Sequence, residues 1–212
     1  MLKSINKVVK ILVFSDFILN SGWGFLAPVF AIFLVKEIAA GNMIEAAKIA
    51  GFTSLIYWII KSFLQIPIGR YLDKNHGEKD DFWFMFLGTF LAGLTPFGYL
   101  FSSLPWHIYL LQVLHALGMA MAVPSWYAIF TRHVDRGREA FEWSLESTSI
   151  GIAVGIAGAI GGIMAGLFGF KLIFILVGTF TIISDLLILL IYKEISPADK
   201  SFSRILPFRL PF

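Results

Sequence analysis

Six long apolar stretches, separated by short polar breaks, make up most of the chain. The breaks carry Gly, Pro, Asn or charged residues, as turns between helices do. Because an apolar helix needs about 20 residues to cross the hydrocarbon core of a bilayer, each stretch is long enough to span a membrane. The pattern therefore predicts an all-α membrane protein whose six transmembrane helices cover residues 11–35, 49–72, 82–102, 107–131, 142–167 and 171–192.

The composition agrees with a membrane location. Mean hydropathy is +0.79 over 212 residues, and 22 Phe and 6 Trp are more apolar surface than one soluble core of this size could hide. The net charge is +3, but the basic residues form no stripe of the kind that binds nucleic acid. The absence of Cys excludes disulfides, thiolate metal sites and a Cys nucleophile. We expect no metal and no cofactor.

The distribution of Lys and Arg predicts the orientation. With the N-terminus in the cytoplasm, 13 basic residues fall on the inside and three on the outside, and Lys61 stays within a span. This places both termini of a multi-pass inner-membrane protein in the cytoplasm. The basic N-terminus resembles a signal peptide, but its apolar part is too long and has no cleavage site, so we interpret it as a retained first span.

An internal repeat of three helices is visible in short sequence matches. Pro28 corresponds to Pro124, each followed closely by Ala-Ile-Phe, and weaker matches in the same order link the second span with the fifth and the third with the sixth. Since three is odd, the second unit is inverted relative to the first. We expect a cytoplasmic N-terminus (1–10), a first repeat (11–102), a second repeat (107–192) and a cytoplasmic tail (193–212).

An enzyme is not expected. No Ser lies in the Gly-x-Ser context that an intramembrane serine protease needs, with a His on another helix. The sequence also lacks a Gly-rich phosphate loop of the Walker type and a His-Glu-x-x-His motif.

Three stretches resemble the major facilitator superfamily. "GRYLDKNHGEK", after the second span, is similar to that family's loop between helices 2 and 3, with Gly77 one residue late. "LLQVLHALGMAMAVPSWYAIF" resembles its fourth helix, with Leu114 where an arginine is often found. The Gly-rich fifth span resembles the antiporter subset, but Gly158 replaces the usual proline, and plain helix packing explains the small residues equally well.

The resemblance covers about residues 10–192, which corresponds to the amino-terminal six-helix half of the family's usual twelve helices. It implies a secondary active transporter of a small organic solute that works by alternating access, is proton-coupled and needs a second half. A homodimer or a separate six-helix partner would supply that half. The alternative is a non-transporting membrane subunit or a truncated transporter fragment.

Four charged residues fall inside predicted spans, namely Asp16, Lys61, Glu146 and Asp185. A charge at the centre of a bilayer costs about 3 kcal/mol on insertion scales, so these residues should face a cavity or one another. We expect an ion pair between Asp16 and Lys61. Asp16 or Glu146 is a candidate proton carrier, with Lys61 as counter-charge or anion anchor. The alternative is a structural salt bridge. Asp185 is the weakest candidate.

Four further side chains are candidates for contact with the solute or the proton. Asn20, Trp23 and Gln65 are polar or amphipathic groups on the first two spans. His115 has an ordinary pKa that suits proton coupling, although a hydrogen-bonded core histidine is the more common role.

The resemblance also implies a latch, by which we mean a set of charged contacts on the cytoplasmic side. In the family, the loop carboxylate lies near the start of a helix in the opposite half, while the basic residues pair with nearby acids. Such contacts are favourable because helix N-termini attract carboxylates. The residues expected to form the latch are Gly69, Asp73, Lys74, Gly77, Lys79, Arg132, Arg136 and Glu142.

Overall fold

The computed structural model describes residues 5–75 and 77–195, and the regular secondary structure within them is all helical. Six of the described helices are long and apolar enough to cross a membrane, which confirms the six predicted spans. Part of the predicted tail, from residue 196 on, lies outside the described residues. The long helices are α1 (Lys7–Leu26), α3 (Met43–Asn75), α4 (Lys79–Tyr99), α5 (Pro105–His133), α6 (Glu139–Phe168) and α7 (Phe170–Ile188).

Short polar sequences at the helix ends explain where the helices begin. The side chain of Asn6 accepts a hydrogen bond from the Val8 N–H at 2.8 Å and caps α1. Asn42 caps α3 by accepting from two backbone N–H groups at 3.0 and 3.1 Å. Between α6 and α7 a single residue, Gly169, turns the chain at a φ of 77°, which favours glycine.

The first span is interrupted where the sequence has a proline. The helix α1 ends at Leu26, and a short α2 (Phe30–Phe33) and one π-helical turn (Leu34–Ile38) follow the break. Pro28 has no N–H to donate to the preceding turn. Its repeat counterpart Pro124 is accommodated inside α5, so the two prolines do not have the same local effect.

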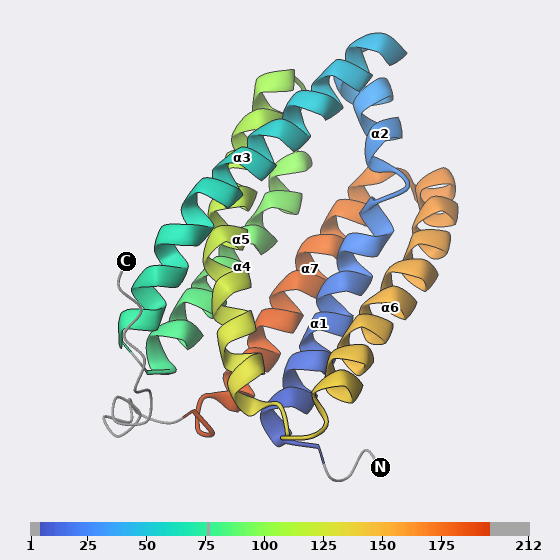
Figure 1. The fold of residues 1–212 in the computed structure, drawn as a ribbon. Coiled ribbons are helices and arrows are strands. Elements are labelled where there is room, and N and C mark those ends of the chain that lie inside the picture. Colours follow the sequence, from blue (N-terminus) through green and yellow to red (C-terminus); the bar gives the residue numbers. More distant parts are fainter. Residues whose placement is uncertain (1–4, 76, 196–212) are drawn as a thin grey trace.

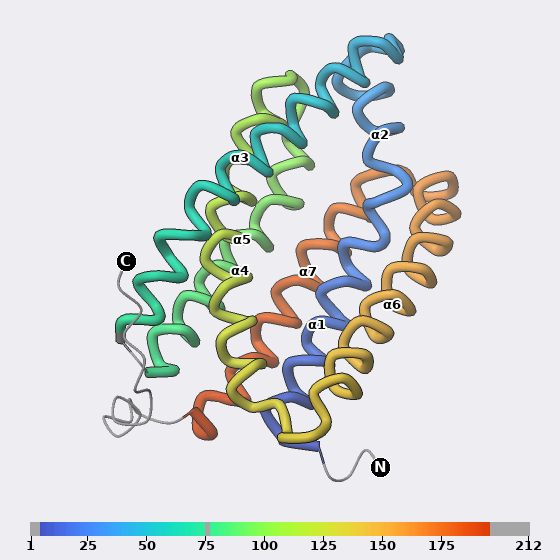
Figure 2. The backbone as a smooth tube through the Cα atoms, in the orientation of Figure 1, coloured from blue at the N-terminus to red at the C-terminus, as the bar shows by residue number. Residues whose placement is uncertain are grey.

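The six long helices form a layered bundle in which each packs mainly on one or two neighbours (Figures 1 and 2). The order across the bundle is α3, α5, α4, α7, α1 and α6. Exchanging α1 with α5, α3 with α6 and α4 with α7 maps these contacts onto themselves. The packing therefore has the two-fold symmetry that two inverted three-helix repeats predict. The limits of the repeats, 11–102 and 107–192, stay a prediction.

Small residues allow the central helices to approach closely. A Cβ on Gly88 of α4 would lie 2.5 Å from the backbone oxygen of Gly118 on α5. On α6, the buried residues Ala153, Ala157 and Gly161 form one face, and Gly161 packs on the α1 backbone at Phe25. The small residues of the fifth span thus have a packing role.

The loop after the second span is shorter than expected. Gly69, Asp73 and Lys74 belong to the last turns of α3, and Lys79 is the first residue of α4. The charged stretch therefore extends the two helices beyond their apolar parts, at the lower end of the bundle in Figure 1. We use "lower" and "upper" in the sense of that figure.

Candidate functional site

A cavity of about 330 Å³ lies in the lower half of the bundle, between five helices. We call it the lower cavity. Its wall is mostly apolar and aromatic, and its two carboxyl groups come from α1 and α6. The lining residues are Asp16, Leu19, Met85, Thr89, Met119, Ala122, Val123, Trp126, Tyr127, Trp143, Glu146, Ser147, Ile150, Ser184 and Ile188.

Two acidic side chains meet in the lower cavity. Asp16 of α1 and Glu146 of α6 both line it, and their carboxyl groups are close enough to interact electrostatically. Glu146 is only 4% exposed. The Ser184 hydroxyl, on the same wall, donates to the backbone oxygen of Ser15 at 2.7 Å and ties α7 to α1 beside Asp16. The sequence identified both acids separately, and the fold brings them together.

The predicted ion pair between Asp16 and Lys61 is wrong. Lys61 lies on α3, and its ammonium is 5.0 Å from the Trp58 ring centroid and 5.7 Å from that of Tyr57. The residues sit on opposite sides of the packing order, because α1 and α3 are separated by α7, α4 and α5. The first two long helices follow each other in the sequence but do not pack side by side, so Asp16 and Lys61 are not in contact.

A second cavity, of about 400 Å³, lies in the upper half of the bundle. We call it the upper cavity. Trp23 and His115 are stacked in its wall, with ring centroids 4.4 Å apart and planes at 6°. The Tyr57 ring also packs against His115, with the two ring centroids 5.0 Å apart. The lining residues are Trp23, Leu26, Ala27, Phe30, Thr53, Ser54, Tyr57, Trp58, Tyr99, Gln112 and His115.

The remaining candidates of the spans lie outside both cavities. Asn20 donates its side-chain amide to the backbone oxygen of Asp16 at 2.9 Å, within its own helix. Gln65 is half-buried on α3. Asp185 of α7 is 1% exposed, and neither carboxylate oxygen has a hydrogen-bond partner among the described residues. Of the predicted contact residues, the structure thus places only Trp23 and His115 in the wall of the upper cavity.

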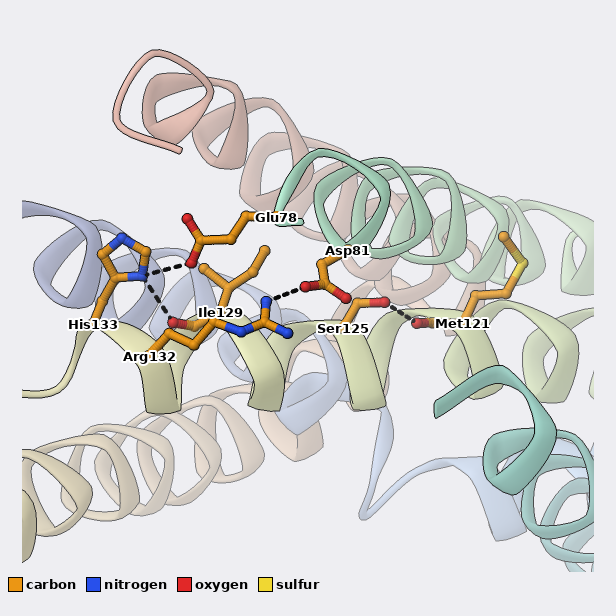
Figure 3. A network of polar contacts seen from close by, with 7 residues as sticks. All are labelled: Glu78, Asp81, Met121, Ser125, Ile129, Arg132 and His133. Carbon is orange, nitrogen blue, oxygen red and sulfur yellow. Dashed lines mark hydrogen bonds and ion pairs between the residues drawn. The ribbon is translucent and has the colours of Figure 1, made fainter. Parts of the chain in front are cut away.

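A polar network at the lower end joins α4 to α5 (Figure 3). The Arg132 guanidinium donates to the carboxylate of Asp81, which is fully buried. One turn away from this pair, the His133 ring lies 3.4 Å from the Glu78 carboxylate and also contacts the backbone oxygen of Ile129 at 3.0 Å. The network closes the lower end of this helix pair.

The residues predicted to form the latch lie around this network, and their role as a latch stays a prediction. Arg132 pairs with Asp81. Glu142 is buried and accepts a hydrogen bond from the Asp135 N–H at 3.2 Å. The side chains of Asp73, Lys74 and Arg136 are exposed, as is that of Lys79, while Gly77 is buried. Sequence analysis missed Glu78, Asp81 and His133. A signal for these contacts was available in the sequence. Acidic residues lie in the first turn of α4, and basic residues lie in the last turn of its antiparallel neighbour α5.

We expect Arg132→Met to destabilise the bundle by about 1–3 kcal/mol, because it leaves the buried carboxylate of Asp81 without its donor. The matched control is Lys7→Met at the exposed pair of Lys7 with Glu194, 2.7 Å long. There the hydrogen bond and charge of Lys7 lower the pKa of Glu194, but an exposed pair contributes little. Thermal unfolding in detergent measures both variants. Equal midpoints for the two would contradict a structural role for the Arg132 pair.

The family comparison can be set beside this geometry. The family model described as Major Facilitator Superfamily matches residues 12–210, which is nearly the whole chain. The chain belongs to the Major Facilitator Superfamily. Membership in this superfamily of membrane transporters agrees with the six spans and with the contact pattern of two inverted three-helix units. A comparison with curated proteins found no match.

Proposed function

We propose that the chain is one six-helix half of a proton-coupled secondary transporter for a small organic solute, with the proton bound in the lower cavity and the solute in the upper cavity. The observation that carries the proposal is the pair formed by Asp16 and Glu146 inside a cavity of a superfamily member. An intramembrane carboxyl group is costly and marks an ion or proton route by default.

The carboxyl pair has the chemistry of a single-proton site. Two carboxylates in contact repel each other, so one proton shared between them lowers their energy. When the lower cavity opens to water, hydration stabilises the doubly ionised pair and the proton leaves. Closure removes this hydration, so the pair must first take a proton from the water of the open cavity. Opening and protonation are thereby coupled without any cofactor.

The second half is proposed to pack on the outer members of the bundle. Only 11% of the apolar window of α3 and 17% of that of α6 is buried, against 39–50% for the other spans. On α6 the small exposed residues Gly151, Gly155, Gly162 and Gly166 have open space where a side chain would lie. Close helix approach needs such residues in a membrane. A second copy of this chain or another six-helix unit would cover this face.

Rocking of the two halves would then expose the cavities alternately. The bias of Lys and Arg toward the lower end supports a cytoplasmic location for that end and for the N-terminus, in a cell or inner membrane. The lower cavity would open to the cytoplasm and the upper cavity to the outside.

The absence of Cys makes a direct test possible, because a single introduced cysteine can be followed by labelling. Ser147→Cys reports on the lower cavity and Ser54→Cys on the upper cavity. We expect their maleimide labelling rates in nanodiscs to change in opposite directions between pH 6 and pH 8, each divided by the rate of the exposed reference Ser103→Cys. Rates that follow the reference at every pH would favour a non-transporting subunit or fragment and contradict the proposal.

A further inference from the structure

The upper cavity has a wall of aromatic faces contributed by three helices. Trp23 comes from α1, Tyr57 and Trp58 come from α3, and His115 comes from α5. His115 is stacked on Trp23 and packs against Tyr57 at an angle of 31° between the ring planes, and these contacts hold the three rings together. A wall of this kind favours a planar, apolar solute, because rings stack on rings and bury a large area.

A positive charge lies at the lower edge of this wall. The Lys61 ammonium rests against Trp58 and Tyr57, one helical turn from both, and it also interacts electrostatically with His115. Among the residues that the structure describes, no carboxylate forms an ion pair with it. The intramembrane acids Asp16 and Glu146 lie across the bundle from Lys61, on α1 and α6, and interact electrostatically with each other in the lower cavity. A lysine in a span without an anion needs one for its charge to be stabilised.

The upper end of the cavity offers neutral polar groups. The Gln112 amide donates to the Tyr99 hydroxyl at 2.6 Å, and Thr53 donates to the backbone oxygen of Ile49 at 2.6 Å. The hydroxyl groups of Tyr99 and Thr53 therefore already have hydrogen-bond partners within the chain. No described acidic residue lines this cavity. The electrostatic asymmetry of the site comes from Lys61 alone.

We infer that the upper cavity binds an aromatic monoanion, with its ring against the aromatic wall at Trp58 and its carboxylate on Lys61. An aromatic wall can also bind organic cations. In this cavity, however, the Lys61 ammonium already lies against two of the rings and would repel a second cation. The inference deepens the proposed function, on which it rests, by naming the class of solute. The cavity, of about 400 Å³, is large enough for a bicyclic carboxylate.

Four probes separate the contribution of the aromatic ring to binding from that of the negative charge. 2-Naphthoate is the expected ligand class, 2-naphthamide keeps the ring without the charge, decalin-2-carboxylate keeps the charge without the aromatic face, and trimethyl(2-naphthylmethyl)ammonium reverses the charge. Binding to the full chain in nanodiscs is measured by titration calorimetry. We expect 2-naphthoate to bind at least about tenfold more tightly than each of the others, since one tenfold step corresponds to about 1.4 kcal/mol.

Variants assign the charge selectivity to Lys61. In Lys61→Met the preference for 2-naphthoate over 2-naphthamide should fall to about twofold or less, and Lys61→Arg should retain it. The matched control is Lys48→Met, on the same helix, where the exposed Lys48 lies 3.5 Å from Glu45 and away from the cavity. Trp58→Leu should weaken all naphthyl probes, whereas Trp106→Leu, at an exposed position outside the cavity, should weaken none.

The inference is overturned if the amide or the cation binds as tightly as 2-naphthoate, or if Lys61→Met keeps the full preference. Gel filtration of each variant in detergent confirms that it is folded, and the 2-naphthamide affinity of Lys61→Met shows directly whether the cavity is intact. Failure of the proposed function looks different. In that case 2-naphthoate binds as described, but the labelling rates at Ser54→Cys and Ser147→Cys do not depend on pH.

Discussion

Asp16→Asn abolishes the pH response of the lower cavity. In protein with Ser147→Cys as the reporter, we expect the normalised labelling rate to rise between pH 6 and pH 8, because ionisation of the pair with Glu146 favours a hydrated, open cavity. A one-proton equilibrium shifts at most about tenfold per pH unit, since one unit corresponds to about 1.36 kcal/mol. The Asn variant should change by about twofold or less over the whole range. It keeps the size of the side chain and removes its titration.

Two variants serve as controls for this result. Asp16→Glu keeps a carboxyl group facing Glu146 and should retain a pH response. Asp185→Asn removes a carboxyl group that is buried in α7 but lines neither cavity, and it should leave the response unchanged. If Asp185→Asn abolished the response and Asp16→Asn did not, the proton site would have to be moved from the α1–α6 contact to α7.

Gly161→Leu separates α6 from α1. A Cβ at this position would lie 2.3 Å from the backbone oxygen of Phe25, and backbone atoms cannot move aside as a side chain can. Overpacking in a helix contact costs about 1–3 kcal/mol and more where the obstacle is rigid. We expect a loss of at least about 2 kcal/mol in the free energy of unfolding, followed by tryptophan fluorescence during denaturation in detergent.

The adjacent residue provides the control. Gly162→Leu points into open space, with no atom within 4 Å of its Cβ, and should leave the stability of the six-helix unit within about 0.5 kcal/mol. Because Gly162 lies on the face proposed for the second half, the same variant should reduce cross-linked dimer if a second copy packs there. Equal destabilisation by the two variants would contradict the α1–α6 packing described above.

The number of the spans and their approximate positions follow from composition along the chain. A run of about 20 apolar residues must become a helix in a bilayer, because lipid offers no hydrogen-bond partner to the backbone. The same argument works for local features such as the break after Leu26, which Pro28 causes. The charged stretch from Gly69 to Lys79 was less predictable, since helices can continue past the apolar part into water. In this chain α3 extends to Asn75.

Partners across the bundle were the part that the sequence could not provide. Asp16 and Lys61 both fall inside predicted spans, but that does not say which helices touch. The interleaved packing of the two repeats puts α6 beside α1 and α5 beside α3. It therefore brings Glu146 to Asp16 and leaves Lys61 on the aromatic wall.

By itself, the sequence determined that this protein is a six-span helical unit of the major facilitator type, with acids and a lysine inside the membrane. Hydrophobicity and helix periodicity are properties of short stretches of sequence, so the sequence was sufficient to predict the spans and the charged residues within them. Only the tertiary structure decided that the acids share one cavity and the lysine borders another. That outcome depends on contacts between helices far apart in the chain, and close backbone approach at residues such as Gly88 and Gly161 selects those contacts.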